Sequence, residues 1–196
     1  MIRLGLTGSI ATGKSTVLSA FADLGIAVFS ADEAVHQLYR GSGVEPVEHL
    51  FPGVAADGVV DRAALSRVLI AHPERLAELE AVVHPLVREE MRRFLQEAEA
   101  SGAEIAVIDI PLLFESGADY GLDAIAVTSV PDALVRQRAL SRPGMSVEKL
   151  ETILARQLPQ EEKRKRADYL IDTSGSPDNA RDQVMQLVQK LRAEAV

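Results

Sequence analysis

Residues Gly8 to Ser15 read G-S-I-A-T-G-K-S and fit the pattern G-x-x-x-x-G-K-[ST], which holds phosphate groups. In such a loop the backbone N–H groups and the positive end of the following helix point at the phosphates. Gly8 and Gly13 are expected to adopt backbone torsions that are closed to other residues. Lys14 is expected to reach the β- and γ-phosphates, and the Ser15 hydroxyl to ligate Mg²⁺. The pattern predicts a bound nucleoside triphosphate, but it leaves open where the terminal phosphate goes.

The neighbouring sequence places this loop between a strand and a helix. A short apolar run at residues 2–6 predicts a buried parallel strand. After Lys14, apolar residues at 17, 18, 21 and 24 have helical spacing, and Gly25 ends the helix. Thr16 is expected to add a hydroxyl near the phosphates. The alternative, a flexible loop of Gly and Ser that binds nothing, does not require this context.

Strands and helices alternate along the rest of the chain, which predicts an α/β fold of the P-loop NTPase type. We expect a doubly wound parallel sheet of about five strands. The further strands are expected at 26–29, 105–110, 124–130 and 169–172, and helices at 31–39, 132–140, 147–158 and from 178 onward. From 44 to about 102 the pattern is helical throughout, and Pro85 should kink or break the helix just after His84.

These elements predict three regions. The nucleotide-binding core is expected at 1–43, 103–137 and 167–196. A helical domain for the second substrate is expected at 44–102, and a lid at 138–166. In such a sheet, ligands bind outside the carboxyl ends of the strands, where the phosphate loop also lies.

Composition restricts the class of protein. Apolar residues make up 47% of the 196 residues and charged residues 26%, enough for a packed core. The chain has no cysteine, so disulfides and thiolate chemistry are excluded, which fits a cytoplasmic protein. We expect no secretory leader and no membrane span. The net charge of −8 argues against nucleic acid as a partner, although a locally basic stretch at 131–166 suits a small polyanion.

Several charged residues are candidates for phosphoryl transfer. Asp32 follows the second strand and could take or orient the proton of an acceptor hydroxyl, although Ser30 or Asp32 could instead cap the next helix. Asp109 ends an apolar strand and could assist a metal or hold a loop. Arg138 and Arg142 lie beside a Pro-Gly break, as a mobile lid requires, or form a solvated helix face. The basic run at 163–166 is expected to be solvated.

The sequence excludes several classes of protein that bind nucleoside triphosphates. A GTPase would need a guanine-reading Asn-Lys-x-Asp run, and the sequence has a single asparagine, Asn179, in a different context. A motor, a helicase or a large ATPase needs a longer chain. A small-molecule kinase remains.

Five short motifs, in order and at fitting spacings, resemble the dephospho-CoA kinase family. They are the phosphate loop, Ala31-Asp32, Val83-His84-Pro85-Leu86, Pro111-Leu112-Leu113-Phe114-Glu115 and Ala167-Asp168-Tyr169-Leu170-Ile171. The resemblance covers the chain from Leu4 to about Gly175. It implies transfer of the ATP γ-phosphate to the 3′-hydroxyl of the dephospho-CoA ribose, with Mg²⁺.

The resemblance also implies roles for single residues. Ala11, Thr12, Gly13, Lys14, Ser15 and Thr16 would bind the ATP phosphates, with Asp32 as the base. His84 and Pro85 would belong to the domain that cradles dephospho-CoA, although His84 could also be a core or helix-end histidine. Leu112 and Glu115 would line the cleft, and Arg138 and Arg142 would act from the lid.

The sequence departs from the family pattern at three places. Ser30 stands where the family often has aspartate, Ser9 and Ala11 stand where glycines are common, and residues 172–175 replace an Asn-rich turn. Whether that turn contacts the adenine is therefore not predicted.

Two alternative functions also stay open. One is another P-loop kinase, acting on a nucleoside, nucleotide or shikimate-like acceptor, and the other is a non-catalytic ATP-binding regulator. The oligomeric state is not predicted.

Overall fold

The computed structural model describes residues 1–194, which divide into two compact units. The first unit contains Met1–Phe29 and the chain from Ala98 onward, and the second contains Ser30–Glu97. The predicted boundaries of the helical domain were 44 and 102, so the second unit starts earlier and ends sooner than that interval.

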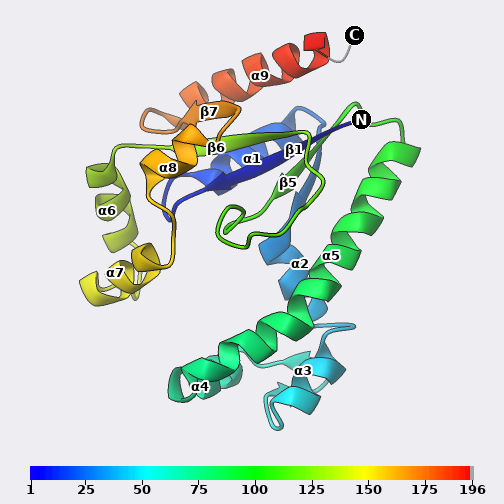
Figure 1. The fold of residues 1–196 in the computed structure, drawn as a ribbon, viewed down its shortest axis with the longest axis vertical. Helices are drawn as coiled ribbons and strands as arrows, with labels where there is room; N and C mark the ends of the chain where they lie inside the picture. The colour runs from blue at the N-terminus through cyan, green and yellow to red at the C-terminus, as the bar shows by residue number, and fades with distance from the viewer. Residues whose placement is uncertain (195–196) are drawn as a thin grey trace. The chain divides into compact units, whose positions relative to one another are not determined.

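A five-stranded sheet organises the first unit, as predicted (Figure 1). Its strands, in spatial order, are β2 (Ala27–Ser30), β5 (Ile105–Asp109), β1 (Ile2–Gly8), β6 (Ala124–Ser129) and β7 (Tyr169–Asp172). β1 pairs in parallel with both β5 and β6, and β6 pairs in parallel with β7. The strand that precedes the phosphate loop therefore lies in the middle of the sheet, because it has a neighbour on each side.

The register of the strands brings several polar residues to one edge. Gly8 at the end of β1 lies opposite Thr128, and Ser129 lies opposite Asp172. On the other side of β1, Leu6 lies opposite Asp109, the last residue of β5. These are the carboxyl ends of parallel strands, where ligands bind in sheets of this type.

One face of the sheet is covered by two helices, α1 (Lys14–Asp23) and α9 (Pro177–Glu194). Their apolar residues form one buried core with the strands, which includes Leu4, Leu6, Phe21, Val107, Ile171, Val184 and Val188. On the opposite face, the chain packs closely over Gly5, where a Cβ would lie 2.6 Å from Leu122 and 3.4 Å from Leu113. The segment after β5 therefore lies directly against this face.

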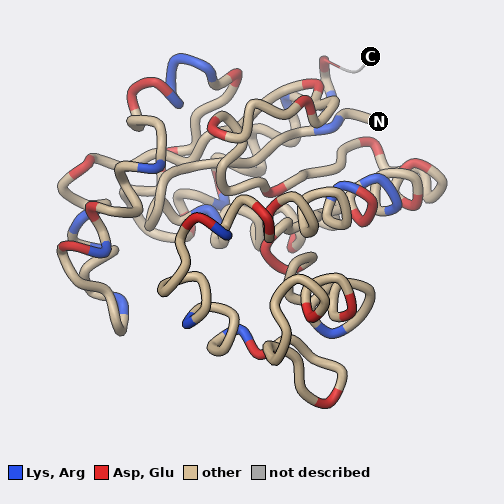
Figure 2. The backbone as a smooth tube through the Cα atoms, turned by 60° about the horizontal axis from the view of Figure 1, so that its bottom comes forward, with Lys and Arg blue, Asp and Glu red and all other residues tan. Residues whose placement is uncertain are grey.

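Three short helices follow the fourth strand of the sheet, and they are α6 (Asp132–Leu140), α7 (Val147–Ala155) and α8 (Gln160–Lys165). The sequence predicted a single helix from 147 to 158, but α7 ends at Ala155 and Pro159 caps a separate helix. Proline cannot extend a helix but is well suited to its start, which explains the division. Figure 2 shows the acidic residues of α8 followed by its basic ones, an order that complements the helix dipole.

The second unit has a core of its own. It contains α2 (Ala31–Leu38), α3 (Val44–Leu50), α4 (Arg62–Ala71), a 3₁₀ turn (Pro73–Arg75), all but the last three residues of α5 (Leu76–Ala100) and the hairpin of β3 (Ala55–Ala56) and β4 (Val59–Val60). Phe51, Val47, Val60 and Val83 are among the residues of this core. The prediction of a wholly helical segment was wrong at the hairpin. Its turn, Asp57-Gly58, has φ values of 51° and 74°, as a two-residue hairpin loop requires.

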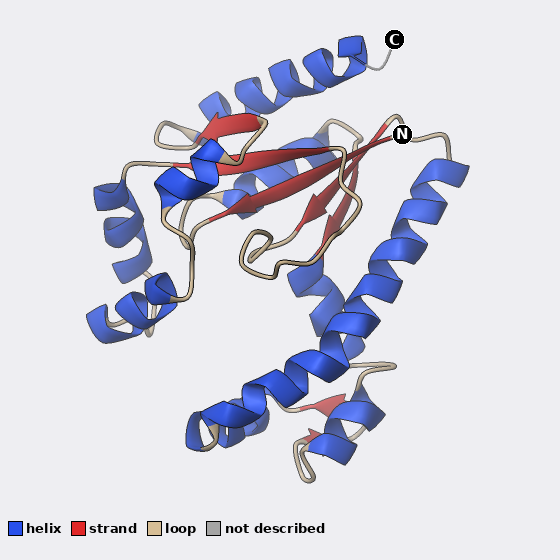
Figure 3. Ribbon diagram, viewed as in Figure 1, coloured by secondary structure: helices blue, strands red, loops and turns tan. Residues whose placement is uncertain are grey.

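Helix α5 is continuous from Leu76 to Ala100, with Pro85 inside it. A complete break after His84 is therefore excluded. Proline removes one backbone hydrogen bond and crowds the preceding turn, and Figure 3 shows the helix changing direction in its N-terminal half. None of the helices formed by residues 1–194 has the length and apolar character that crossing a membrane would require.

Candidate active site

The phosphate loop connects β1 to α1, in the strand–loop–helix context that the sequence predicted. Gly13 precedes the helix in a left-handed conformation, with φ of 77°, and Ala11 is also left-handed, with φ of 60°. For a residue with a Cβ, this conformation costs about 1–2 kcal/mol. Ala11 therefore keeps its conformation because its surroundings impose it, and its methyl group is buried against Ala139 and Leu150.

Threonine hydroxyl groups fix the interior of the loop. Thr12 is 1% exposed, and its hydroxyl contacts the Ser9 carbonyl oxygen and the Thr128 hydroxyl, each at 2.7 Å. From the end of β7, the Thr173 hydroxyl donates to the Thr12 carbonyl oxygen at 2.6 Å. The Thr12 hydroxyl therefore makes its contacts within the protein. Thr128 and Thr173 were not predicted, although polar residues at the carboxyl ends of apolar strands could have indicated them.

Gly8 is required for a different reason than predicted. Its φ is not positive; instead, a Cβ at this position would lie 2.1 Å from the Thr128 Oγ1 and 2.6 Å from the Thr12 Oγ1. These are the hydroxyl groups that hold the loop closed. The glycine is needed for space rather than for torsional freedom.

We expect Gly8→Ala to destabilise the protein by about 2–3 kcal/mol, because the new methyl group overpacks a buried site. It should also weaken ATP binding, since Thr12 and Thr128 must separate to admit the methyl group. Denaturant unfolding and nucleotide titration would measure the two effects. Gly41→Ala is the control, because its nearest neighbour would be the Gln37 carbonyl oxygen at 3.5 Å. Equal stability of both variants would contradict the prediction.

Lys14 begins α1, and its ammonium group forms an ion pair with the Asp109 carboxylate at the end of β5. Both side chains are largely buried, with 16% and 5% exposed. Asp109 thus holds the lysine amine at the edge of the loop. Ser15 and Thr16, in the same first turn, are exposed to solvent.

Arg138 lies in the last turn of α6 and Arg142 lies two residues after the end of this helix, and both lie beside the phosphate loop. A cavity of about 250 Å³ is lined by Ala11, Gly13, Thr16, Arg138, Arg142, Thr173, Gly175, Ser176, Pro177 and Ala180. Arg138 donates from Nη2 to the Thr173 carbonyl oxygen at 2.9 Å. The structure therefore brings both arginines to one cavity with the phosphate loop and with the turn after β7.

Glu115 and Leu112 lie in the segment after β5. Leu112 is 42% exposed, whereas Glu115 accepts a hydrogen bond from the Leu158 N–H at 2.8 Å and pairs with Lys163 at 2.8 Å. The expectation of a solvated run at 163–166 was wrong for Lys163 and Arg164, whereas Lys165 and Arg166 are exposed. Lys163 is 0% exposed, and Arg164 donates to the Ser129 hydroxyl at 2.7 Å.

Burial raises the pKa of the Glu115 carboxyl, but the Lys163 ammonium and the Leu158 amide lower it more, so that it lies below 4.5. A carboxylate with a lowered pKa stabilises the fold above its unfolded pKa, and this stability is lost as the pH falls through the folded pKa. We expect Glu115→Gln to be less stable than wild type at pH 7, with a smaller difference at pH 3. Denaturant unfolding at both pH values would measure it, and a constant difference would contradict the assignment.

In the second unit, Ser30 and Asp32 have distinct positions at the start of α2. The Ser30 hydroxyl accepts from the Glu33 N–H at 3.3 Å and is therefore the helix cap. Asp32 lies in the first turn with an exposed side chain. Ser30 therefore takes the capping role, and among residues 1–194 the Asp32 carboxylate accepts no capping hydrogen bond at this helix.

His84 and Pro85 lie inside α5, and both are exposed. The alternative of a core histidine is therefore excluded for His84. The residues that the structure brings together in the first unit are Gly8–Thr16, Asp109, Arg138 and Arg142. Asp32, His84 and Pro85 belong to the second unit.

Comparison with known proteins decides the family. The family model for dephospho-CoA kinase matches residues 2–179. The chain belongs to the dephospho-CoA kinase family. It is 52% identical over 191 residues to a dephospho-CoA kinase from Brucella melitensis, covering 97% of this chain and 96% of that one.

Two solved structures support this membership. A protein from Thermus thermophilus is 36% identical with a TM-score of 0.78, and a dephospho-CoA kinase from Campylobacter jejuni is 26% identical with a TM-score of 0.69. Each alignment covers 96% of both chains. Membership of the dephospho-CoA kinase family therefore rests on the sequence and the fold together, and it agrees with the resemblance seen in the five motifs.

Proposed function

We propose that this protein transfers the γ-phosphate of ATP to the 3′-hydroxyl of the dephospho-CoA ribose, giving coenzyme A and ADP. The observation that carries the proposal is the cavity shared by the phosphate loop, Arg138 and Arg142 in a chain of the dephospho-CoA kinase family. Phosphoryl transfer depends on positioning and on neutralising charge, and these residues supply both.

In this proposal the nucleotide is bound by the loop and the cavity beside it. The N–H groups from Ala11 to Thr16 and the positive end of α1 would hold the phosphates. Lys14 would contact the β- and γ-phosphate oxygens. The cavity, which includes the turn at 173–177 and has Arg138 and Arg142 in its lining, would take the nucleoside end.

Ser15 is the residue that would hold Mg²⁺. Its hydroxyl is exposed in the first turn of α1, directly after Lys14, the residue that would contact the phosphates. Mg²⁺ keeps most of its ligands as water and phosphate oxygens, so one protein hydroxyl fits its needs. When bound, the ion neutralises charge on the transferring phosphate.

The acceptor would be activated by Asp32, an exposed carboxylate that follows β2. It would accept the proton of the 3′-hydroxyl as the oxygen attacks phosphorus. His84 and Pro85 would contact dephospho-CoA from α5, and Leu112 from the segment after β5. For Glu115, acceptor binding stays a prediction, since its Oε1 already contacts Leu158 and Lys163. A cytoplasmic location and the lack of a nucleic-acid partner also stay predictions.

The test is ADP release with Mg·ATP, measured with and without dephospho-CoA, and with adenosine and AMP as competing acceptors. ADP formed only with dephospho-CoA, together with coenzyme A detected by mass, would support the proposal. Turnover with a nucleoside or nucleotide instead would favour another small-molecule kinase. If the protein binds ATP but releases no ADP with any of these acceptors, the result would favour a non-catalytic ATP-binding regulator.

A further inference from the structure

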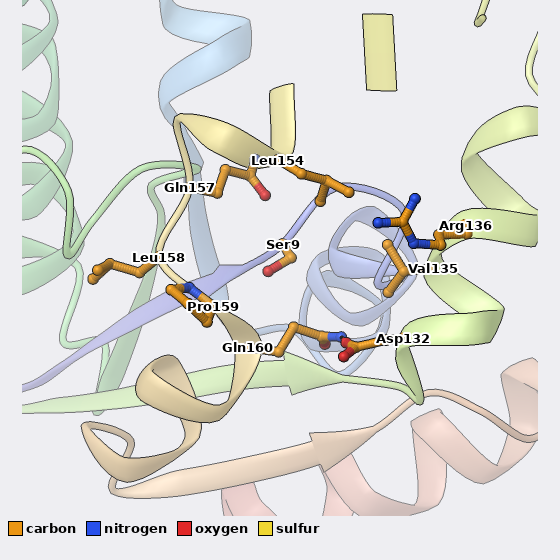
Figure 4. Close-up of a pocket in the computed structure, with 9 residues that line it drawn as sticks. All are labelled: Ser9, Asp132, Val135, Arg136, Leu154, Gln157, Leu158, Pro159 and Gln160. Atoms are coloured by element: carbon orange, nitrogen blue, oxygen red, sulfur yellow. Dashed lines mark hydrogen bonds between the residues drawn. The ribbon is translucent and has the colours of Figure 1, made fainter. Parts of the chain in front are cut away.

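Residues 157–164, which join α7 to α8 and include most of α8, contact several loops at the carboxyl edge of the sheet. Gln160 donates to the Val130 carbonyl oxygen at 3.1 Å and also contacts Asp132, while Arg164 donates to Ser129. Figure 4 shows Gln157, Leu158, Pro159 and Gln160 arranged around Ser9 of the phosphate loop, where they line a cavity of about 200 Å³. We call residues 157–164 the connecting segment.

The connecting segment touches the phosphate loop through one hydrogen bond. The Ile10 N–H donates to the Gln157 Oε1 at 3.1 Å. Ile10 directly precedes Ala11, whose left-handed φ of 60° is rarely adopted by residues with a Cβ. The Gln157 side chain therefore fixes the peptide group that joins Ser9 to Ile10, one residue before the strained Ala11.

Gln157 is itself held in place by its neighbour. The N–H of Leu158 donates to the Glu115 Oε1, and the same oxygen pairs with Lys163 at 2.8 Å. A second contact joins the segment after β5 to the chain just beyond the connecting segment, since the Arg166 guanidinium lies 5.8 Å from the centre of the Phe114 ring. Glu115 thus connects the segment after β5 to both ends of the connecting segment.

The pair of Glu115 and Lys163 is poorly suited to stabilise the fold by itself. Although the Lys163 Nζ lies 2.8 Å from the Glu115 Oε1, neither this nitrogen nor the Glu115 Oε2 makes a hydrogen bond of good geometry among residues 1–194, and both atoms are buried. Buried ion pairs with incomplete hydrogen bonding gain little stability over apolar residues of the same size. The pair instead orients the Glu115 carboxylate toward the Leu158 N–H.

We propose that Gln157 is a positioning residue for nucleotide binding, which holds the phosphate loop through Ile10, and that Glu115, oriented by Lys163, holds Gln157. The proposal rests on the proposed function in one respect, that the loop binds ATP. It assigns Glu115 to the support of the phosphate loop rather than to the acceptor.

The first test is the affinity for Mg·ADP, measured by calorimetry on the full chain without acceptor. Gln157→Leu keeps the size of the side chain but removes the oxygen that accepts from Ile10. If the competent loop is then populated only about a tenth of the time, the apparent Kd rises about tenfold. The KM for ATP should rise similarly, with the KM for dephospho-CoA within twofold. Thr152→Ala, on the exposed face of α7, is the control, with an unchanged Kd. An ADP Kd within twofold of wild type in Gln157→Leu would overturn the proposal.

A second pair of variants tests the support from Glu115. Lys163→Met combined with Glu115→Gln removes both charges but keeps an oxygen for the Leu158 N–H, and its Kd should stay within about threefold of wild type. Lys163→Met combined with Glu115→Leu lacks that oxygen and should lose about tenfold. Adding Gln157→Leu to the second variant should cause no further loss, because all three changes act through one contact. Equal ADP affinity in the two double variants would overturn the role of Glu115.

Failure of the proposed function can be told apart from failure of this inference. ADP binding needs no acceptor, so a wild-type protein that binds ADP but does not phosphorylate dephospho-CoA would contradict the function alone. A wild-type protein that phosphorylates dephospho-CoA, with an unaffected Gln157→Leu variant, would contradict the inference alone.

Discussion

Lys14→Ala is expected to lower kcat by about a thousandfold. Negative charge spreads over the γ-phosphate oxygens in the transition state, and a fixed cation beside them is worth roughly 10²–10³ in rate or more. ADP release at saturating ATP and dephospho-CoA would measure the loss. Binding of ADP should weaken much less, since the loop N–H groups remain.

Lys165→Ala is a matched control for this variant. It removes the same side chain from an exposed position on α8, where Lys165 pairs only with Glu162 among the interactions of residues 1–194. Its kcat should equal that of wild type. A decrease of less than tenfold for Lys14→Ala, with the fold intact by circular dichroism, would remove Lys14 from the chemical step.

Asp32→Asn is expected to lower kcat by about 10²–10⁴, because general base catalysis contributes an effect of this size. The amide is nearly the same size as the carboxylate but cannot take up the proton. ATP affinity should change by less than about threefold, since in the proposed function the residues of the other unit hold the phosphates. Single-turnover kinetics would separate the chemical step from binding.

Ser30→Ala is the control, two residues earlier. Loss of the α2 cap should cost about 1 kcal/mol of stability and leave kcat close to wild type. If Ser30→Ala lowered kcat as much as Asp32→Asn, the integrity of the helix start would explain both effects. Wild-type turnover in Asp32→Asn would remove the base assignment.

The parts of the fold that the sequence predicted are those whose signals are local. β1, β5 and β6 are near-continuous apolar runs because both faces of a parallel sheet are covered, and each lies within a residue or two of its predicted place. The hairpin of β3 and β4 was missed because each strand has two residues. Its Asp57-Gly58 turn is nevertheless a known hairpin signal and could have revealed it.

The candidate site was predictable where one motif contains it, and not where distant segments meet. Lys163 lies in a run of four basic residues that reads as solvated, and its partner Glu115 lies far away in sequence. No local pattern marks such a pair. Similarly, Gly8 was recognised as essential, but its neighbour Thr128 comes from another strand, so the steric reason appears only in the fold.

The order of the strands bears on how the chain folds as it is synthesised. β1 is made first, but its partners begin at residues 105 and 124. At about 5–20 residues per second, β1 waits on the order of 5–20 s for its first neighbour. By then the second unit, Ser30–Glu97, has been made in full with its own core.

The phosphate loop is completed later still, because Thr173 must arrive to hold Thr12. A nucleotide bound by the complete loop could therefore stabilise only the last stage of assembly, and β1 must wait for its partner strands without that stabilisation.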